Sequence, residues 1–347
     1  MAEGFDVEIV SPAVSIRAQL DRWNTPRLSI PQYWRLLEDE KYFHRLNNDY
    51  DFVVFPNWSN ALEYTKGEKV RLIYDFFSAT MVEHAIISNS DELTKKKADK
   101  LKIIAQADIV IANGQVQADY ATQFLSKEAE RTVTGPIPAV RLSTQRLQKE
   151  ISPPPHPSGR LRLFVGGFHQ AWTTGIGVPE LVRLAASYPV DIHAIGLGQH
   201  LHLRDLSRVQ RLPGEGEGLV RHQVSSFENY RFLNGSCDAA LDVFTPNAER
   251  RISYSTRAIS ALSCGCPVIT MAFTEIGELV RQTGAGWVLE ECSIDALREL
   301  LVRLAHNPDE ISAAREKTAD FWARYIDPKV QIAPLVKMLK SGEFNVR

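Results

Sequence analysis

The stretch TPNAERRISYSTRAISALSCGCPVIT, from Thr245 to Thr270, decides the fold of this chain. Ser253 or Ser255 suits a helix N-cap, because a serine hydroxyl can accept a hydrogen bond from an amide of the first turn. Apolar residues then recur at helical spacing as far as Gly265, which suits the left-handed position after a helix. Pro267-Val268-Ile269 begins an apolar strand. The stretch therefore predicts a loop, a helix and a buried strand.

This predicted helix also has the features of an anion site. Its first amides have no partner within the helix, and Arg257 stands one turn in. Amides at a helix N-terminus and a guanidinium together favour a phosphate or carboxylate. An ordinary helix–strand unit with no ligand is the alternative interpretation of the same residues.

Composition narrows the class of protein. The chain has 347 residues, which is enough for two domains with separate cores. Its formal net charge of −2 argues against a nucleic-acid-binding protein that relies on phosphate contacts. The sequence has no apolar run long enough to span a bilayer and no signal peptide at its start, and its four cysteines form no disulfide framework. We therefore expect a cytoplasmic location.

Strand and helix patterns alternate twice along the chain, which predicts two doubly wound α/β domains with parallel sheets. The first series occupies residues 1–150 and the second residues 160–325. Between them, residues 151–159 (ISPPPHPSG) form a proline-rich linker, because prolines remove backbone donors. We expect the segment from Glu310 to Leu339 to be helical.

Two apolar strands of the first domain bear on function. The run KVRLIYD ends in Asp75, and ligands of open α/β sheets gather beyond the carboxyl ends of strands. Capping of the next helix is an equal alternative role for Asp75. Residues Thr132 to Pro138 are predicted to form the last strand of this domain, and the KKKADK run before Leu101 is predicted to be a solvated helix face.

The motifs in and around residues 245–270 resemble those of a known protein family. A loop bearing Glu249 is followed by S-x-S-T-R (residues 253–257), C-G-x-P-V-I (residues 264–269) and E-I-G-E-L-V (residues 275–280). This order resembles the nucleotide-sugar site of GT-B glycosyltransferases, most closely the retaining family 4 type. The resemblance covers most of the chain beyond Gly4. It implies two Rossmann-like domains that face a cleft, with the helix of residues 326–347 packed back on the N-terminal domain.

The resemblance also implies roles for particular residues. Gly166-Gly167-Phe168-His169-Gln170-Ala171-Trp172 is similar to a G-G-x-x-x-W segment beside the donor, although a tight turn with a core tryptophan is the alternative. The candidate catalytic residues are Asp75, His169, Glu249 and Arg257. The candidate donor-binding residues are Gly166, Gly167, Trp172, Ser253, Tyr254, Ser255, Thr256 and Glu275.

The sequence departs from the family pattern in three places. The first strand and glycine-rich loop of the N-terminal domain are absent, so we expect that domain to be shortened or the sequence to begin inside a longer one. The run TTGIGVPE (residues 173–180) lacks the usual Arg and Lys. The second of two family glutamates, eight residues apart, has no counterpart at Ser260. Arg257, with Arg250 or Arg251, then has to neutralise the leaving diphosphate.

The implied reaction transfers a sugar from a nucleotide-diphosphate donor to a hydroxyl of a glycan, lipid-linked glycan or natural product. We expect retention of configuration, no metal and no cofactor. We expect a nucleotide sugar and a carbohydrate or lipid-linked acceptor as partners; peripheral membrane contact and a protein partner stay open. Two other functions also stay open: a GT-B nucleotide-sugar epimerase, and a non-catalytic GT-B-like subunit that supports a partner.

Overall fold

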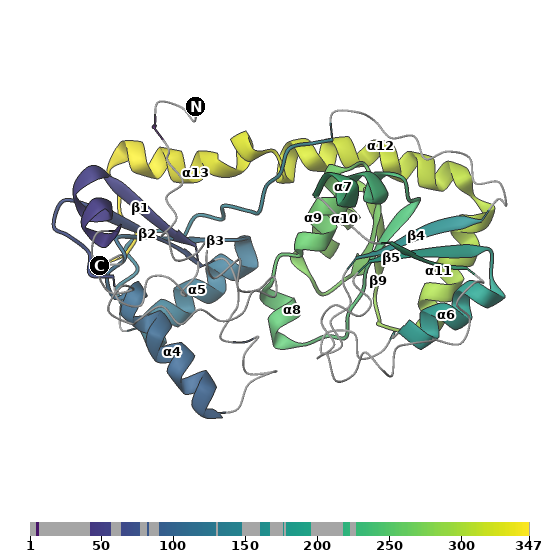
Figure 1. The fold of residues 1–347 in the computed structure, drawn as a ribbon, viewed down its shortest axis with the longest axis horizontal. Coiled ribbons are helices and arrows are strands. Elements are labelled where there is room, and N and C mark those ends of the chain that lie inside the picture. The colour runs from purple at the N-terminus through teal and green to yellow at the C-terminus, as the bar shows by residue number, and fades with distance from the viewer. Residues whose placement is uncertain are drawn as a thin grey trace, which may run out of the picture.

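The structure is a computed structural model, in which two α/β units lie side by side (Figure 1). The structure describes residues 5–6, 42–56, 64–76, 82, 90–129, 131–147, 160–166, 176, 178–195, 218–222 and 227–346. The proline-rich linker, residues 151–159, lies outside these ranges, and of residues 1–10 only Phe5 and Asp6 are described. We call the unit that precedes the linker the N-terminal domain and the unit that follows it the C-terminal domain.

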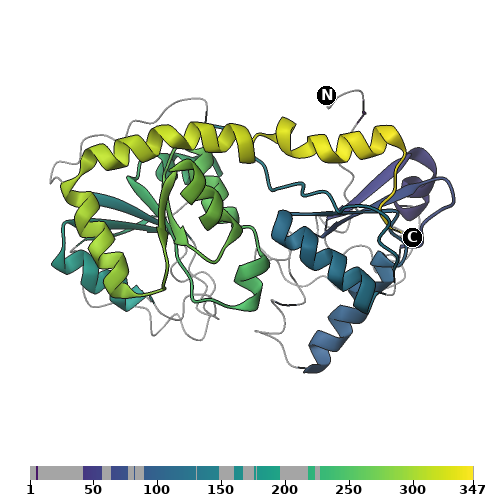
Figure 2. The same cartoon turned by 180° about the vertical axis from the view of Figure 1, so that it is seen from behind.

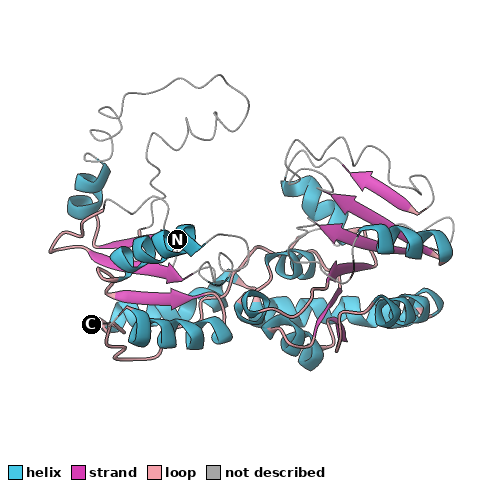
Figure 3. Cartoon of the chain, turned by 90° about the horizontal axis from the view of Figure 1, so that it is seen from below, coloured by secondary structure: helices cyan, strands magenta, loops and turns pink. Residues whose placement is uncertain are grey.

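Each unit is built on a parallel sheet, as predicted (Figure 3). The N-terminal sheet has the order β1-β2-β3 and consists of β1 (Phe52–Pro56), β2 (Arg71–Phe76) and β3 (Ile109–Ala112). The C-terminal sheet has the order β6-β5-β4-β7-β8-β9 and consists of β4 (Leu161–Gly166), β5 (Val190–Ile195), β6 (Leu219–His222), β7 (Ala239–Asp242), β8 (Val268–Met271) and β9 (Gly286–Leu289). Strands β3, β4, β7 and β8 are buried along their whole length, because helices cover parallel sheets on both faces.

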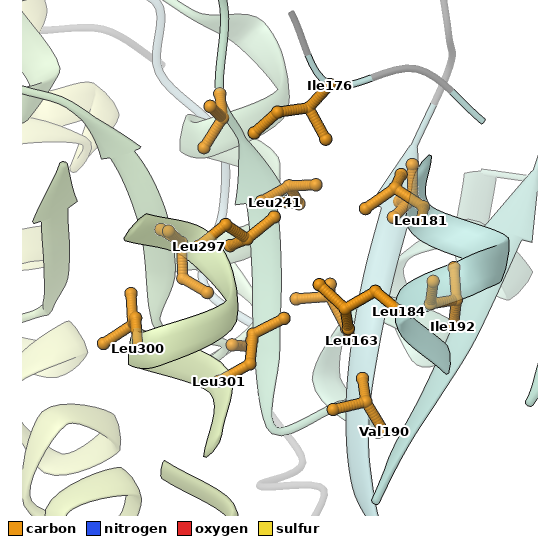
Figure 4. Close-up of a cluster of buried hydrophobic side chains, with 14 of the residues drawn as sticks. Leu163, Ile176, Leu181, Leu184, Val190, Ile192, Leu241, Leu297, Leu300 and Leu301 are labelled. Carbon is orange, nitrogen blue, oxygen red and sulfur yellow. The ribbon is translucent and has the colours of Figure 1, made fainter. Parts of the chain in front are cut away.

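Helices follow most strands and cover the sheets. The N-terminal domain has α4 (Ser90–Ile104) and α5 (Gln115–Glu128). The later helices are α6 (Val178–Ser187), α7 (Phe227–Gly235), α8 (Ala248–Ile252), α9 (Thr256–Ser263), α10 (Glu275–Thr283), α11 (Ile294–His306), α12 (Pro308–Tyr325) and α13 (Pro328–Ser341). Leucines of α6 and α11 pack on one face of the C-terminal sheet (Figure 4), and α9, α10 and α12 pack on the other. The sheet is therefore doubly wound.

Helix α9 forms where the sequence predicts it. Ser255 is the N-cap, and its hydroxyl accepts a hydrogen bond from the amide of Ala258 over 3.4 Å. Ala258, Ile259, Ala261 and Leu262 are buried against the sheet. Gly265 has a φ of 76°, the left-handed conformation that lets the chain turn directly into β8.

Two segments connect the domains. In the first, residues 141–147 run along the C-terminal domain, where the indole of Trp322 donates to the carbonyl of Thr144 over 2.9 Å and the amide of Leu147 donates to Ser263 over 3.0 Å. In the second, α12 and α13 lie along one side of both domains (Figure 2). Leu335 of α13 packs with Ile73 and other isoleucines of the N-terminal sheet. The end of the chain is thus part of the N-terminal core.

The predicted strand from Thr132 to Pro138 does not form. The structure has only isolated bridges there, Val133 with Val346 and Ala112 with Ala139. Pro136 and Pro138 have no amide hydrogen, so this segment cannot supply a regular ladder beside β3. In place of a neighbouring strand, the side chain of Asn345 bonds to backbone groups of β3. It accepts from the amide of Val110 and donates to the carbonyl of Val110, each over 2.9 Å.

We expect Asn345→Ala to destabilise the N-terminal domain. Asn345 is 1% exposed, and its loss leaves two buried backbone groups of Val110 without partners. Unsatisfied buried groups cost about 1–3 kcal/mol each, so we expect a loss of roughly 3 kcal/mol. Urea denaturation measures this loss. Glu343→Ala, an exposed change in the same segment, serves as the control; equal stability of the two variants would contradict the assignment.

Candidate functional site

The order of the strands in the C-terminal sheet creates a switch point between β4 and β7. From β4 the chain winds outward through β5 and β6, and then returns to β7 and winds the other way through β8 and β9. Ligands of doubly wound sheets bind beyond the carboxyl ends of the strands at such a point. Here those ends are Gly166 of β4 and Asp242 of β7.

Arg257 joins the two strand ends at this switch point. Its Nη1 lies 3.5 Å from the carbonyl oxygen of Gly166, and its Nε lies 3.4 Å from Oδ1 of Asp242. The guanidinium also stacks 4.6 Å from the ring centre of Phe244. Because Arg257 belongs to the first turn of α9, its positive charge and the positive end of the helix dipole share one location.

A second guanidinium contacts the same aromatic ring. Arg250 lies 4.3 Å from the ring centre of Phe244, and its Nε lies 3.0 Å from Oε2 of Glu249. Each arginine therefore has a buried carboxylate beside it, Glu249 for Arg250 and Asp242 for Arg257. The four side chains together carry no formal net charge. The guanidinium groups are held in place while their charge is partly compensated.

Buried polar atoms that make no hydrogen bond lie at the ends of β7 and β8. Asp242 and Thr270 are neighbours in the sheet and are 2% and 0% exposed. Within the described part of the chain, neither carboxylate oxygen of Asp242 makes a hydrogen bond, and the hydroxyl of Thr270 makes none. Such groups are rare in folded proteins, since each costs about 1–3 kcal/mol. They are consistent with the switch point as the place where a ligand would bind.

The candidate catalytic carboxylate Glu249 bonds to the C-cap residue of its own helix. It lies on α8 and is buried, and its Oε1 accepts a hydrogen bond from the Ser253 hydroxyl over 2.5 Å. Ser253 is the C-cap of α8, whereas the sequence offered it as an N-cap alternative to Ser255. Direct contact of Glu249 or Ser253 with a sugar nucleotide stays a prediction.

The other residues of the S-x-S-T-R segment face different surroundings. Thr256 is exposed at the first position of α9, beside Arg257. Tyr254 is buried, and the guanidinium of Arg141 lies 6.0 Å from its ring centre. Burial raises the pKa of the Tyr254 phenol far above its ordinary value of 10.0, so the phenol stays protonated. A donor contact by Tyr254 or Ser255 stays a prediction.

Glu275 faces the N-terminal domain. It is the first residue of α10, after β8, and its carboxylate contacts Arg141 and the start of α5. The structure thus brings Gly166, Thr256 and Arg257 together at the switch point and places Glu275 in a contact between domains. The remaining predicted residues, Gly167, His169 and Trp172, lie outside the described residues.

In the N-terminal domain, Asp75 lies near the carboxyl end of β2 and is coupled to a buried lysine. Burial raises the pKa of Asp75 to about 6, against the opposing effect of the Lys100 charge. Lys100 ends the KKKADK run and is 2% exposed, so the prediction of a solvated face was wrong at this residue. Its Nζ lies 3.8 Å from the ring centre of Phe76. A carboxyl group with a pKa near neutrality is suited to exchange a proton with a hydroxyl.

We expect Lys100→Met to remove a pH dependence of stability. Burial lowers the pKa of Lys100 to about 7 from its ordinary value of 10.5. Between these values the unfolded chain binds the proton and the folded chain does not, so folding stability rises with pH, by up to about 1.4 kcal/mol per pH unit. Urea denaturation from pH 7 to 9 measures the slope. The slope should persist in Lys102→Met, an exposed position on α4, and a persistent slope in Lys100→Met would contradict the assignment.

Sequence reasoning missed three polar residues of this region. Asp242 ends a buried apolar strand, and that position was a usable signal, as it was for Asp75. Lys100 stands in a run of charges that is otherwise typical of a helix surface. Arg141 is preceded by no recognisable motif, and only the folded chain brings it to Glu275.

Comparison with known proteins shows which solved structures have a similar fold. No protein-family model matches the chain, and no curated protein sequence does. Solved structures do match, at low sequence identity. HepE of Anabaena in complex with UDP-glucose is 15% identical, with a TM-score of 0.65 over 94% of this chain and 89% of that chain. Sucrose-phosphate synthase of Thermosynechococcus elongatus is 14% identical, with a TM-score of 0.64 over 92% and 82% of the two chains.

A third match has the same overall arrangement. A UDP-forming α,α-trehalose-phosphate synthase of Burkholderia xenovorans, in complex with glucose-6-phosphate, is 12% identical, with a TM-score of 0.60 over 89% of this chain and 78% of that chain. Among the described residues, no helix is long and apolar enough to cross a membrane. The two parallel α/β domains and these neighbours confirm the predicted architecture: the chain has the GT-B fold.

Proposed function

We propose that this protein is a nucleotide-sugar-dependent glycosyltransferase. The observation that carries the proposal is the position of Arg257, in the first turn of α9 and between the ends of β4 and β7. A fixed guanidinium at a helix N-terminus suits the diphosphate of a nucleotide sugar. The solved neighbours support the same ligand class, because the HepE structures hold UDP or UDP-glucose.

In the proposed reaction, the C-terminal domain holds the donor and the N-terminal domain receives the acceptor. The bond between the anomeric carbon and the diphosphate oxygen breaks, and Arg257 with the α9 amides stabilises the charge that develops on the leaving diphosphate. The acceptor hydroxyl enters from the side of Asp75 and bonds to the anomeric carbon, while its proton passes to a leaving phosphate oxygen. We propose retention of configuration and no requirement for a metal. The acceptor is a glycan, a lipid-linked glycan or another hydroxyl compound.

A screen of nucleotides tests the donor class. The purified protein is heated with UDP, GDP, ADP, CMP and dTDP and with their sugar conjugates, and the unfolding temperature is recorded. A ligand at 100 times its dissociation constant stabilises the folded state by about 2.7 kcal/mol, which is readily measured. We expect one base to stabilise selectively. Unchanged melting with the whole panel would contradict the proposal.

A non-catalytic GT-B-like subunit is the second candidate function. It is favoured by the buried carboxylates of Asp242 and Glu249, which compensate the charge of the two arginines that a diphosphate needs. Turnover separates the two candidates. A transferase releases the nucleoside diphosphate when an acceptor mixture is added, whereas a binding subunit shows the thermal shift without release.

A further inference from the structure

Helix α5 of the N-terminal domain begins without a capping side chain of its own. Its N-cap is Gly114, and its first turn contains no acidic residue. The amides of a first helical turn need acceptors from elsewhere. The acceptor here is Glu275, 160 residues away in the C-terminal domain: the amide of Gln115 donates to Oε1 over 3.1 Å, and that of Val116 donates to Oε2 over 3.0 Å.

Arg141 completes the surroundings of this carboxylate. Its Nε and Nη2 each lie 3.0 Å from Oε1 of Glu275. The side chains of Glu275 and Arg141 are 10% and 20% exposed, so water screens the ion pair little. One carboxylate therefore receives two amides and a guanidinium from the N-terminal half of the chain. Charge-assisted hydrogen bonds of this kind are stronger than neutral ones.

The backbone on both sides of the contact, at Gly114 before α5 and at Thr274 before α10, accommodates the Glu275 carboxylate. Gly114 has a φ of 128°, and a Cβ atom at this residue would lie 2.7 Å from Oε2 of Glu275. Any larger residue at position 114 would displace the carboxylate. On the other side, the Thr274 hydroxyl accepts from the amide of Gly277 over 3.0 Å and fixes the start of α10. Glu275 is thus held rigidly on the domain that carries Arg257.

We propose that Glu275 is a positioning residue that sets the relative placement of the two domains, and not a ligand of the donor. The part of this inference that concerns turnover rests on the proposed function. The carboxylate aligns α5 with the edge of the C-terminal sheet after β8, and Asp75 and Arg257 are placed relative to each other through that alignment. When the domains separate, water solvates the carboxylate, the guanidinium and the amides. The contact is therefore reversible, as the opening of a substrate cleft requires.

Hydrogen exchange tests the contact without reference to activity. In Glu275→Gln and Glu275→Ala, we expect the amides of Gln115 and Val116 to exchange at least tenfold faster than in the unchanged protein. Glu290→Gln removes an exposed carboxylate from the same domain and should leave this exchange unchanged. Unchanged exchange in both Glu275 variants would overturn the proposal.

Kinetics with a nucleotide-sugar donor then separates positioning from donor binding. We expect Glu275→Gln to keep the dissociation constant for the nucleotide within twofold while kcat falls at least tenfold. Arg141→Met should reproduce this effect, and combining it with Glu275→Gln should add little, because the two residues form one contact. A tenfold weaker nucleotide affinity at unchanged kcat and unchanged exchange would make Glu275 a donor ligand. Failure of the unchanged protein to bind any nucleotide would reject the proposed function, while the exchange result would still decide the contact.

Discussion

Replacement of Arg257 by alanine is expected to weaken nucleoside-diphosphate binding by roughly 10- to 150-fold, because a hydrogen bond to a charged group contributes about 1.5–3 kcal/mol. Lysine at this position should recover only part of the affinity. It keeps the charge but loses the planar fork that spans the ends of β4 and β7. Isothermal titration calorimetry with the nucleotide selected by thermal screening measures both variants.

The stability of the Arg257 variant needs its own control, because the substitution leaves Asp242 without its ion-pair partner. Asp242 is 2% exposed, and breaking a buried pair at one side costs about 3–5 kcal/mol. The double variant Arg257→Met with Asp242→Asn removes both charges and should regain most of that stability without regaining nucleotide affinity. Affinity within twofold of the unchanged protein in a folded Arg257 variant would contradict the donor site.

The parts of the fold that the sequence predicted are those with local causes. Helix α9 and strand β8 could be predicted because the hydroxyl of Ser255, the apolar spacing and the conformation of Gly265 each act within a few residues. The two parallel sheets followed from the alternation of strand and helix patterns. The place of Arg257 in the first turn of a helix was predicted in the same way, and its role in binding an anion stays a prediction.

The parts that could not be predicted depend on contacts between distant residues. No local pattern shows that Asn345 replaces a strand beside Val110, or that Lys100 of a charged run lies under Phe76. For the same reason, the contact of the Glu275 carboxylate with the start of α5 could not be predicted from the sequence. Each of these side chains is polar and is satisfied by a group more than 20 residues away or in another element, which periodicity cannot reveal.

Gly277 is a position where the addition of a single methyl group should cause a large loss of stability. It lies in the first turns of α10, close to the carbonyl at the end of β8. A Cβ atom at Gly277 would lie 2.1 Å from the Met271 carbonyl oxygen and 3.1 Å from the Thr274 hydroxyl. The first distance is far inside van der Waals contact with a backbone atom, which has no rotamer by which to move away. Gly277→Ala therefore requires α10 to shift away from the sheet.

Helix propensity and packing predict stability changes of opposite sign for Gly277→Ala, so the measured stability decides which effect is larger. Propensity alone predicts a gain of about 0.5–1 kcal/mol, because alanine favours a helix over glycine. Overpacking of this severity costs about 3 kcal/mol, which should lower the melting temperature of a domain of this size by roughly 6–12 °C. Gly135→Ala is the matched control, since the nearest atom to its Cβ would lie at 3.9 Å. Its melting temperature should stay close to that of the unchanged protein.

A Gly277→Ala variant that melts at or above the unchanged protein would show that α10 can move from β8 at little cost. In that case Glu275, which stands two residues earlier on the same helix, would not hold the domains in a fixed placement.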